Sequence, residues 1–310
     1  MQLSVIVPTH NPHAGRLRRT LKALRTQTLP ADQWECLLVD NASAPRLELS
    51  DWSPDGPANR RLVAEPETGL SHARRRGFLS SSRDIVVLVD DDNELAPDYL
   101  AETLRLFSTH PEIGAIGGRS LPEFEKTPAP WVREFEAHIA CRDLGDAPQL
   151  STGATDPVST RMEYPACAPI GAGMALRRSA AQSWLERNSH GALTDRRGNE
   201  LSSGGDNDMV FCILRAGWKV GYFPTLKLKH LIPANRLEAA YLARLNRGIH
   251  KSWMQVLTFH DANPWPPIPA WTVPLRQMKA WFTYRAWSNP AAFVRWQGAC
   301  GHFEGRTRTR

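Results

Sequence analysis

The chain has 310 residues, of which 23% are charged and 42% belong to the broad hydrophobic set, and its formal net charge is +6. That length suits one large α/β domain or two small ones, and the composition is ordinary for a soluble globular protein. The mild positive excess would suit phosphate-bearing ligands or an anionic membrane surface. Because the basic residues form no long run and no nucleic-acid-binding signature appears, we expect no nucleic-acid partner.

The cysteines and the N-terminus bear on the cellular compartment. The cysteines are odd in number and lack the spacing of a zinc site or a CxxC motif, which favours free thiols in a reducing cytoplasm; they are Cys36, Cys141, Cys167, Cys212 and Cys300. The chain begins directly with an apolar run, without the basic segment and core of a signal peptide. No stretch of about 18 apolar residues occurs. We therefore expect a cytoplasmic protein, with the inner face of the cell membrane as the alternative location.

The first 110 residues alternate between short apolar runs and amphipathic segments. Strands are expected at 3–7, 35–39, 61–64 and 85–89, and helices between and after them, at about 16–25, 69–80 and 98–107. This alternation predicts parallel strands with right-handed crossovers in a doubly wound sheet. Ligands bind beyond the carboxyl ends of the strands in such sheets, so Asp40 and the acids after position 89 should share one crevice.

Three adjacent carboxylates, those of Asp90, Asp91 and Asp92, follow the fourth predicted strand. Their mutual repulsion favours a nearby positive charge, and a hard divalent cation with oxygen ligands is the natural candidate. A solvated turn is the alternative interpretation, because Asp and the following Asn93 are typical of turns and helix N-caps.

The second half of the chain has a less regular pattern. Residues 122–165 are rich in Pro, Gly, Ser and Thr and are long for a loop, which is typical of functional or mobile segments. The small residues of 171–176 would allow close approach of a ligand or another strand. Strands are expected at 113–119, 171–176, 218–223 and 226–228, with helices at 179–187 and after the Gly-rich turn at 203–208.

The C-terminal part combines a long helix with a Trp-rich tail. A helix packed on the domain is predicted because apolar residues recur at every fourth position, namely Leu237, Tyr241, Leu245, Ile249, Trp253 and Leu257. From Trp265 to Phe303 the tail is rich in Pro and Trp among basic residues. It has two interpretations: a peripheral membrane anchor, or a segment whose aromatic side chains pack onto the rest of the protein.

Six ordered motifs carry a resemblance to a known family. Their order and approximate spacing resemble those of the family 2 glycosyltransferases, which are inverting enzymes with the GT-A fold. The motifs are V-I-V-P-T-H-N at 5–11, L-V-D-N-A-S at 38–43, G-L-S-H-A-R at 69–74, D-D-D at 90–92, G-A-G-M at 171–174 and G-G-D-N-D at 204–208. The resemblance covers residue 3 to about 250.

The resemblance implies an α/β fold with a Rossmann-like, mostly parallel central sheet flanked by helices. It divides the chain into a GT-A domain at 1–232 and a helical, Trp-rich extension at 233–310. Within the domain, residues 1 to about 120 would bind the nucleotide and about 121–232 the acceptor.

Several residues match positions that bind the nucleotide-sugar donor in that family. Pro8 and Thr9 match the loop that contacts the nucleotide, Asp40 the carboxylate that bonds the base, and Arg74 a residue beside the diphosphate. Asp90 and Asp92 match the two acids of the DxD motif. The donor-binding set is therefore Pro8, Thr9, Asn11, Asp40, Asn41, Arg74, Asp90 and Asp91.

The metal ligands implied by the resemblance are Asp92 and His230, and the ion would be Mn²⁺ or Mg²⁺ bound to the diphosphate. A satisfied histidine at a strand end is the alternative for His230. Asp91 would point to the other side of an extended strand, which favours a structural role within the donor-binding set.

Asp206 matches the general base, and its place at a helix N-terminus in a Gly-rich turn suits that role. An Asp that merely caps the helix is the alternative, and Asp208 is a second candidate for the base or for acceptor binding. Many members have Glu where this chain has Gly205, so acceptor binding near the base is expected to differ here. The processive Gln-x-x-Arg-Trp motif is missing, and residues 244–248 stand in its place.

The expected function is metal-dependent transfer of one sugar, with inversion, from a nucleotide donor to an acceptor hydroxyl. A UDP-sugar is the preferred donor, and the acceptor would belong to cell-surface polysaccharide, a lipid-linked sugar or another glycoconjugate. The alternatives are a non-catalytic nucleotide-sugar-binding or membrane-scaffold protein with the same fold, and a sugar-phosphate nucleotidyltransferase. The last would normally carry a Gly-rich, basic phosphate loop where this chain has residues 8–12.

Overall fold

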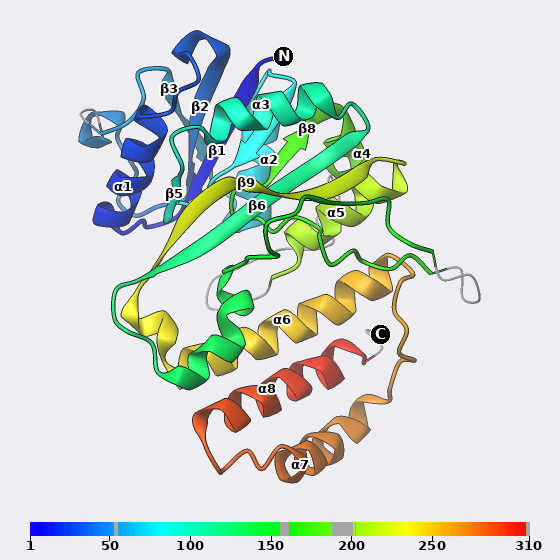
Figure 1. Cartoon of the computed structure of the whole chain (residues 1–310). Coiled ribbons are helices and arrows are strands. Elements are labelled where there is room, and N and C mark those ends of the chain that lie inside the picture. The colour runs from blue at the N-terminus through cyan, green and yellow to red at the C-terminus, as the bar shows by residue number, and fades with distance from the viewer. Residues whose placement is uncertain (53–54, 156–160, 188–200, 202, 308–310) are drawn as a thin grey trace.

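The first half of the protein forms the predicted parallel sheet (Figure 1). The computed structural model describes residues 1–52, 55–155, 161–187, 201 and 203–307. The strands pair in the order β3-β2-β1-β4, and all three pairings are parallel. The elements are β1 (Leu3–Thr9), α1 (Ala14–Arg25), β2 (Trp34–Asn41), β3 (Arg60–Glu65), α2 (Leu70–Ser80) and β4 (Ile85–Leu88).

The second half extends the same sheet with mixed pairing. From β4 the order continues through β8, β6, β9 and β5; β8 is antiparallel to both of its neighbours, and β6 runs parallel to β9. Both β5 and β7 pair antiparallel with β9. The elements are β5 (Asn93–Leu95), α3 (Tyr99–Thr109), β6 (Ile113–Phe124), β7 (Gln149–Ser151), β8 (Ala175–Arg177), α4 (Arg178–Arg187), α5 (Gly205–Arg215) and β9 (Lys219–Ile232).

Some predicted boundaries in this half were wrong. The strand-like stretches at 218–223 and 226–228 are one strand, β9, whose pairing with β6 contains register shifts. Most of the strand expected at 171–176 is a turn, because Gly173 has a φ of 74° and its carbonyl accepts a hydrogen bond from Tyr99 Oη at 2.6 Å. The predicted loop at 122–165 contains the 3₁₀ segment η3 (Pro130–Ile139) and β7 in its described part; residues 156–160 lie outside the described residues.

The apolar side chains of the sheet separate into two cores. Leu3, Val5 and Val7 of β1 pack with the apolar faces of α1 and α3, whereas Ile6 packs with α2, α4 and α5. This division follows the two-residue period of a strand, in which neighbouring side chains point to opposite faces. Helices therefore cover both faces of the sheet and leave the carboxyl ends of β1, β2 and β4 for the candidate site.

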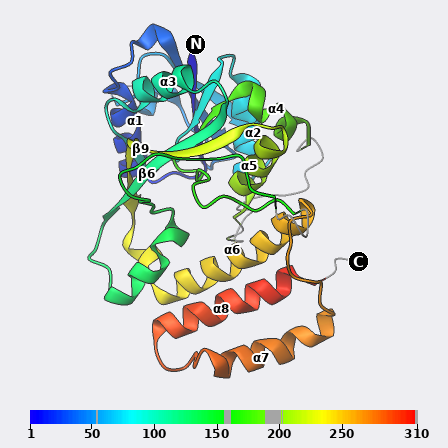
Figure 2. The same cartoon turned by 45° about the vertical axis from the view of Figure 1, so that its right-hand side comes forward.

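The C-terminal helices lie beside the sheet domain, with α8 between α6 and α7 (Figures 1 and 2). They are α6 (Ala239–Phe259), α7 (Val273–Thr283) and α8 (Pro290–Gly305). Two glycines let α8 approach α6, because a Cβ at Gly298 would collide with Asn246 and one at Gly301 with the carbonyl of Arg247. A third apolar core joins α6 and α8 to η3. Of the two interpretations of the tail, packing onto the rest of the protein is therefore the correct one for α8.

Candidate active site

A cavity of about 650 Å³ opens where the carboxyl ends of the strands face α6. Ligand pockets in proteins typically measure roughly 300–1,000 Å³, so a nucleotide sugar would be of suitable size. Its walls combine the ends of β1, β4 and β9 with the first turns of α2 and α5. The predicted site residues that line it are Pro8, Thr9, Asn41, Arg74, Asp90, Asp91, Asp92, Asp206 and His230.

Arg74 supplies a buried positive charge to this cavity. Its Nη2 lies 3.5 Å from Asp90 Oδ1, and only 4% of the side chain is exposed. A Cβ at Gly171 would collide with the guanidinium, so the glycine leaves room for it. The Nε atom is buried and has no hydrogen-bond partner among the described residues. A cation held this way is suited to a phosphate group.

The three consecutive aspartates form a turn after β4 and not an extended strand end. Asp91 therefore lines the cavity together with its neighbours, and its Oδ2 accepts a hydrogen bond from Thr9 Oγ1 at 2.6 Å. Burial raises the pKa of Asp91 to about 6, and the negative charge of Asp92 adds to the rise. The solvated-turn interpretation is wrong for Asp92, whose exposed fraction is 4%.

Asp92 and His230, the two metal ligands implied by the family resemblance, are neighbours. The antiparallel pairing of β5 with β9 places Asn93 opposite His230, which brings His230 Nε2 to 3.4 Å from Asp92 Oδ1. Two atoms that each bind one ion at about 2.1 Å have a similar separation. The donors present therefore fit a divalent cation.

Arg236 joins the same pair and was missed by the sequence analysis. Its Nη1 donates to Asp92 Oδ2 at 3.0 Å and lies 3.4 Å from His230 Nε2. Burial acts to lower the pKa of Arg236, but the negative charge of Asp92 contributes to a net rise. The guanidinium thus lies beside the carboxylate on which the predicted metal would bind. The only sequence clue was a basic residue just beyond Pro233.

Asp206 lies in the first turn of α5 and lines the cavity. Its Oδ2 accepts a hydrogen bond from the backbone amide of Gly171 at 2.9 Å, and its Oδ1 accepts one from the amide of Asn207 at 3.1 Å. The N-cap of α5 is Gly204, so Asp206 is not the capping residue. These two amides hold its carboxylate at the cavity wall.

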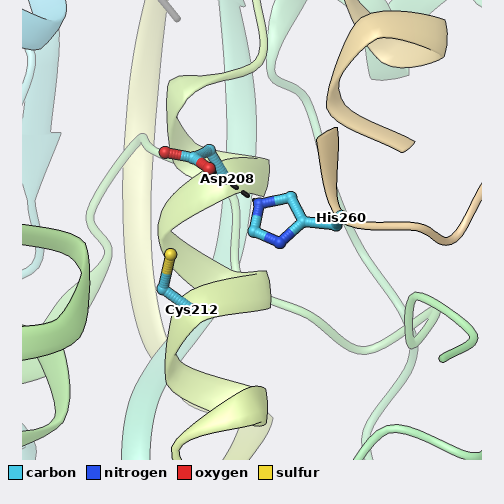
Figure 3. Close-up of side chains that lie close together, drawn as sticks. All are labelled: Asp208, Cys212 and His260. Atoms are coloured by element: carbon cyan, nitrogen blue, oxygen red, sulfur yellow. Dashed lines mark hydrogen bonds and ion pairs between the residues drawn. The ribbon is translucent and has the colours of Figure 1, made fainter. Parts of the chain in front are cut away.

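Asp208 lies on the opposite face of α5, because two residues along a helix correspond to a rotation of roughly 200°. Its exposed fraction is 1%, and its Oδ1 lies 2.7 Å from His260 Nε2 (Figure 3). Cys212 lies one turn further along the same helix. None of these three residues lines the cavity, so their placement does not support acceptor binding by Asp208.

Asp208, Cys212 and His260 form a group of three potential metal ligands whose donor atoms lie within 4.8 Å of one another. Among the described residues it is the one such group found. Burial raises the pKa of the Cys212 thiol to about 12, and the thiolate is the form that binds metals. The short contact between Asp208 and His260 is a hydrogen bond. We therefore interpret the group as a link between α5 and the end of α6.

Three other predicted residues do not line the cavity. Asp40 accepts hydrogen bonds from the amides of Ser43, at 3.1 Å, and Leu47, at 3.2 Å. The Asn11 side chain accepts one from the amide of Ala44 at 2.8 Å, and Gly205 is the buried first residue of α5. The predicted roles of Asp40, Asn11 and Gly205 in substrate binding stay predictions.

The wall opposite the charged residues is apolar. Tyr241, Leu245, Ile249 and Trp253 line the cavity from one face of α6, together with Ile139 of η3. The sequence predicted that these positions of α6 pack on the domain, but it did not predict that they face the ligand space. One cavity thus joins a charged half to an apolar half.

Comparisons with known proteins identify the family of the chain. The model of the family described as glycosyl transferase family 2 matches residues 4–184, and the chain belongs to that family. The matched region contains Arg74 and the three aspartates but ends before Asp206 and His230. The predicted family resemblance is confirmed.

Curated relatives share parts of the chain. The O-antigen biosynthesis protein RfbC of Myxococcus xanthus is 32% identical over 136 residues, which are 40% of this chain and 10% of that protein. An N-acetylglucosaminyltransferase of Sinorhizobium fredii is 25% identical over 260 residues, which are 82% of this chain and 58% of that protein. The chain thus spans from a tenth to just over half of the length of these two relatives.

Solved structures support the fold. The crystal structure of S. aureus TarS 1–349 matches with a TM-score of 0.51 at 12% identity, and the match covers 99% of this chain and 90% of that one. The same fragment in complex with UDP matches with a TM-score of 0.50. This likeness, together with the family match, confirms the α/β GT-A fold. Among the described residues, no helix is long and apolar enough to cross a membrane.

Proposed function

We propose that this protein is an inverting glycosyltransferase that moves one sugar from a UDP-sugar to an acceptor hydroxyl. The observation that carries the proposal is the convergence of Arg74, the three aspartates and Asp206 on one cavity of about 650 Å³ in a family 2 chain. The UDP complex of the TarS fragment supports the choice of nucleotide. The name of one relative, an O-antigen biosynthesis protein, supports an acceptor in polysaccharide synthesis.

In the proposed reaction, the Asp206 carboxylate takes the proton of the acceptor hydroxyl. The acceptor oxygen forms a bond to the anomeric carbon as the bond from that carbon to the diphosphate oxygen breaks, so the electron pair leaves with UDP. Attack from the face opposite the leaving group inverts the anomeric centre. Arg74, whose buried guanidinium faces the same cavity, would bind the diphosphate and offset its growing charge.

A divalent cation fits the same scheme. Asp92 and His230 would hold it, and Mn²⁺ or Mg²⁺ would supply further positive charge at the diphosphate. Arg236 would then have to move from its contact with Asp92 or share the carboxylate with the ion.

The apolar wall of α6 suggests the class of acceptor. A plain sugar presents mainly hydroxyl groups, whereas the side chains of Leu245, Ile249 and Trp253 favour an apolar group. We therefore propose an acceptor whose hydroxyl is joined to a lipid or another apolar moiety. Contact with the membrane that carries such an acceptor is part of the proposal.

The decisive experiment compares Asp206→Asn with the parent protein. UDP binding by calorimetry should change less than threefold, whereas transfer from a UDP-sugar should fall by about 10²–10⁴-fold because the general base is lost. The exposed Asp32→Asn change is the matched control and should leave both values unchanged.

Two outcomes would contradict the proposal. Transfer by Asp206→Asn at the parent rate would remove Asp206 as the base. A parent protein that binds UDP-sugars but neither transfers nor hydrolyses them, with Mn²⁺ or with EDTA, would be a non-catalytic binding protein.

A further inference from the structure

Exposed apolar side chains are concentrated in one short stretch of the protein. Seven of the eleven exposed large hydrophobic residues in the described part of the chain lie between 265 and 287. They are Trp265, Trp271, Leu275, Met278, Phe282, Tyr284 and Trp287, with Trp271 exposed by 74%. Single exposed apolar residues are ordinary, but a contiguous group typically marks an interaction surface.

Four of these side chains form one stripe along α7. Trp271, Leu275, Met278 and Phe282 are spaced by four, three and four residues, which places them on the same side of a helix. Trp271 belongs to the short 3₁₀ segment η6 (Ala270–Thr272), which leads directly into α7. Phe282 also contacts Trp287, with ring centroids 5.8 Å apart. We call these five residues the α7 stripe.

The other face of α7 already holds the helix in place. Gln277 Nε2 donates to Glu304 Oε1 of α8 at 2.8 Å, and Trp281 packs edge-on against Trp296 of α8 at a centroid distance of 4.7 Å. Ala280 is buried on this face. The helix α7 is outermost, with α8 between it and α6 (Figures 1 and 2). The contacts that attach α7 to α8 are therefore made by residues outside the α7 stripe.

The charged residues of α7 and of the segment between α7 and α8 are all basic. Residues 262–303 contain four basic residues and no Asp or Glu. Two of the basic residues, Arg276 and Lys279, are exposed on α7, and Arg285 follows the helix. A second copy of the chain in a two-fold contact would place these like charges near one another. An anionic surface would instead attract them.

We propose that the α7 stripe inserts into the interface of an anionic lipid bilayer. The apolar side chains would enter the boundary between head groups and acyl chains, and Trp271 and Trp287 would lie at the level of the head groups. Arg276, Lys279 and Arg285 would contact lipid phosphates. This inference rests on the membrane contact proposed above, but it does not depend on the transfer chemistry.

The test is flotation of the full chain with vesicles of phosphatidylcholine alone or mixed with phosphatidylglycerol. The parent should bind the anionic vesicles and release them at high salt. The Leu275→Ser/Phe282→Ser variant should bind at least about tenfold more weakly, because two large side chains no longer insert. Arg276→Gln and Lys279→Gln should each weaken binding by about fivefold at low salt.

The protein offers a close control for the serine variant. Leu79 on α2 has the same exposed fraction as Leu275, 56%, and Leu79→Ser should bind vesicles as the parent does. Because all these side chains are exposed, the Tm of each variant should match that of the parent. If the parent protein transfers no sugar to a water-soluble acceptor, that result counts against the proposed function. It does not count against membrane binding by the α7 stripe.

Three results would overturn the inference. The first is a parent protein that does not bind anionic vesicles. The second is a serine variant that binds as tightly as Leu79→Ser. The third is a parent that sedimentation shows to be an oligomer which the serine variant dissociates, since the α7 stripe would then be covered by a second copy.

Discussion

Two aspartate–histidine pairs in this protein have the same chemistry and different surroundings. Asp92 and His230 lie 3.4 Å apart on the wall of the cavity, where Arg236 adds a third charged group. Asp208 and His260 lie 2.7 Å apart away from the cavity, and the ring of His260 stacks on Phe211 at a centroid distance of 4.6 Å. Both pairs are almost fully buried.

Burial and pairing alone therefore do not identify a functional site. Both histidines even share a further feature, a buried Nδ1 without a hydrogen-bond partner among the described residues. What separates the pairs is the open space beside Asp92 and the additional charges that face it. We expect the first pair to act on substrate and the second to hold α5 against the end of α6.

Among the changes that test this comparison, Asp92→Ala should have the largest effect on transfer. If Asp92 holds a cation at the diphosphate, transfer should fall by about 10²–10³-fold, as when one transition-state contact is removed. Initial rates at saturating UDP-sugar and Mn²⁺ would measure it. Activity within a factor of three of the parent would show that the pair in the cavity has no catalytic role.

Asp208→Ala should instead affect folding. Removing the acceptor of this buried hydrogen bond should cost up to about 3 kcal/mol, because the His260 donor would be left unsatisfied in an apolar environment. Urea unfolding followed by fluorescence would measure the change. Asp98→Ala, at the exposed start of α3, is the control. A stable Asp208→Ala protein without transfer activity would reverse the two assignments.

The sequence alone predicted those features of the fold and site that depend on the pattern of neighbouring residues. Apolar runs and turn residues located β1 to β4, adjacency to a strand end pointed to the three aspartates, and the family resemblance pointed to Thr9. Helical periodicity could also have separated Asp206 from Asp208. The contact of Asp208 with His260 spans 52 residues and that of Asp92 with Arg236 spans 144, so only the folded chain reveals them.

Arg236→Gln should have a smaller effect that tests the charge balance at Asp92. Without Mn²⁺ the variant should lose roughly 1–3 kcal/mol of stability, because a buried carboxylate loses its cationic partner. Added Mn²⁺ should stabilise the variant more than the parent, since a bound ion replaces the missing charge. Thermal unfolding with and without Mn²⁺ would measure this, with the exposed Arg244→Gln as control. Equal Mn²⁺ responses would mean that Arg236 and the ion do not share a site.

The smallest expected effect concerns His138 and His250, whose ring centroids lie 6.2 Å apart. Unlike the two histidines compared above, neither is paired with a carboxylate among the described residues. Burial lowers the pKa of both, and for His138 the nearby His250 adds to the effect. The unfolded chain then binds more protons than the folded one below about pH 6.5, so stability should be constant above that pH and fall as the pH decreases below it. The loss should be roughly 1 kcal/mol per histidine over one pH unit. Unfolding free energies between pH 7.5 and pH 5 should therefore slope less steeply in His138→Gln/His250→Gln than in the parent, and parallel curves would contradict the prediction.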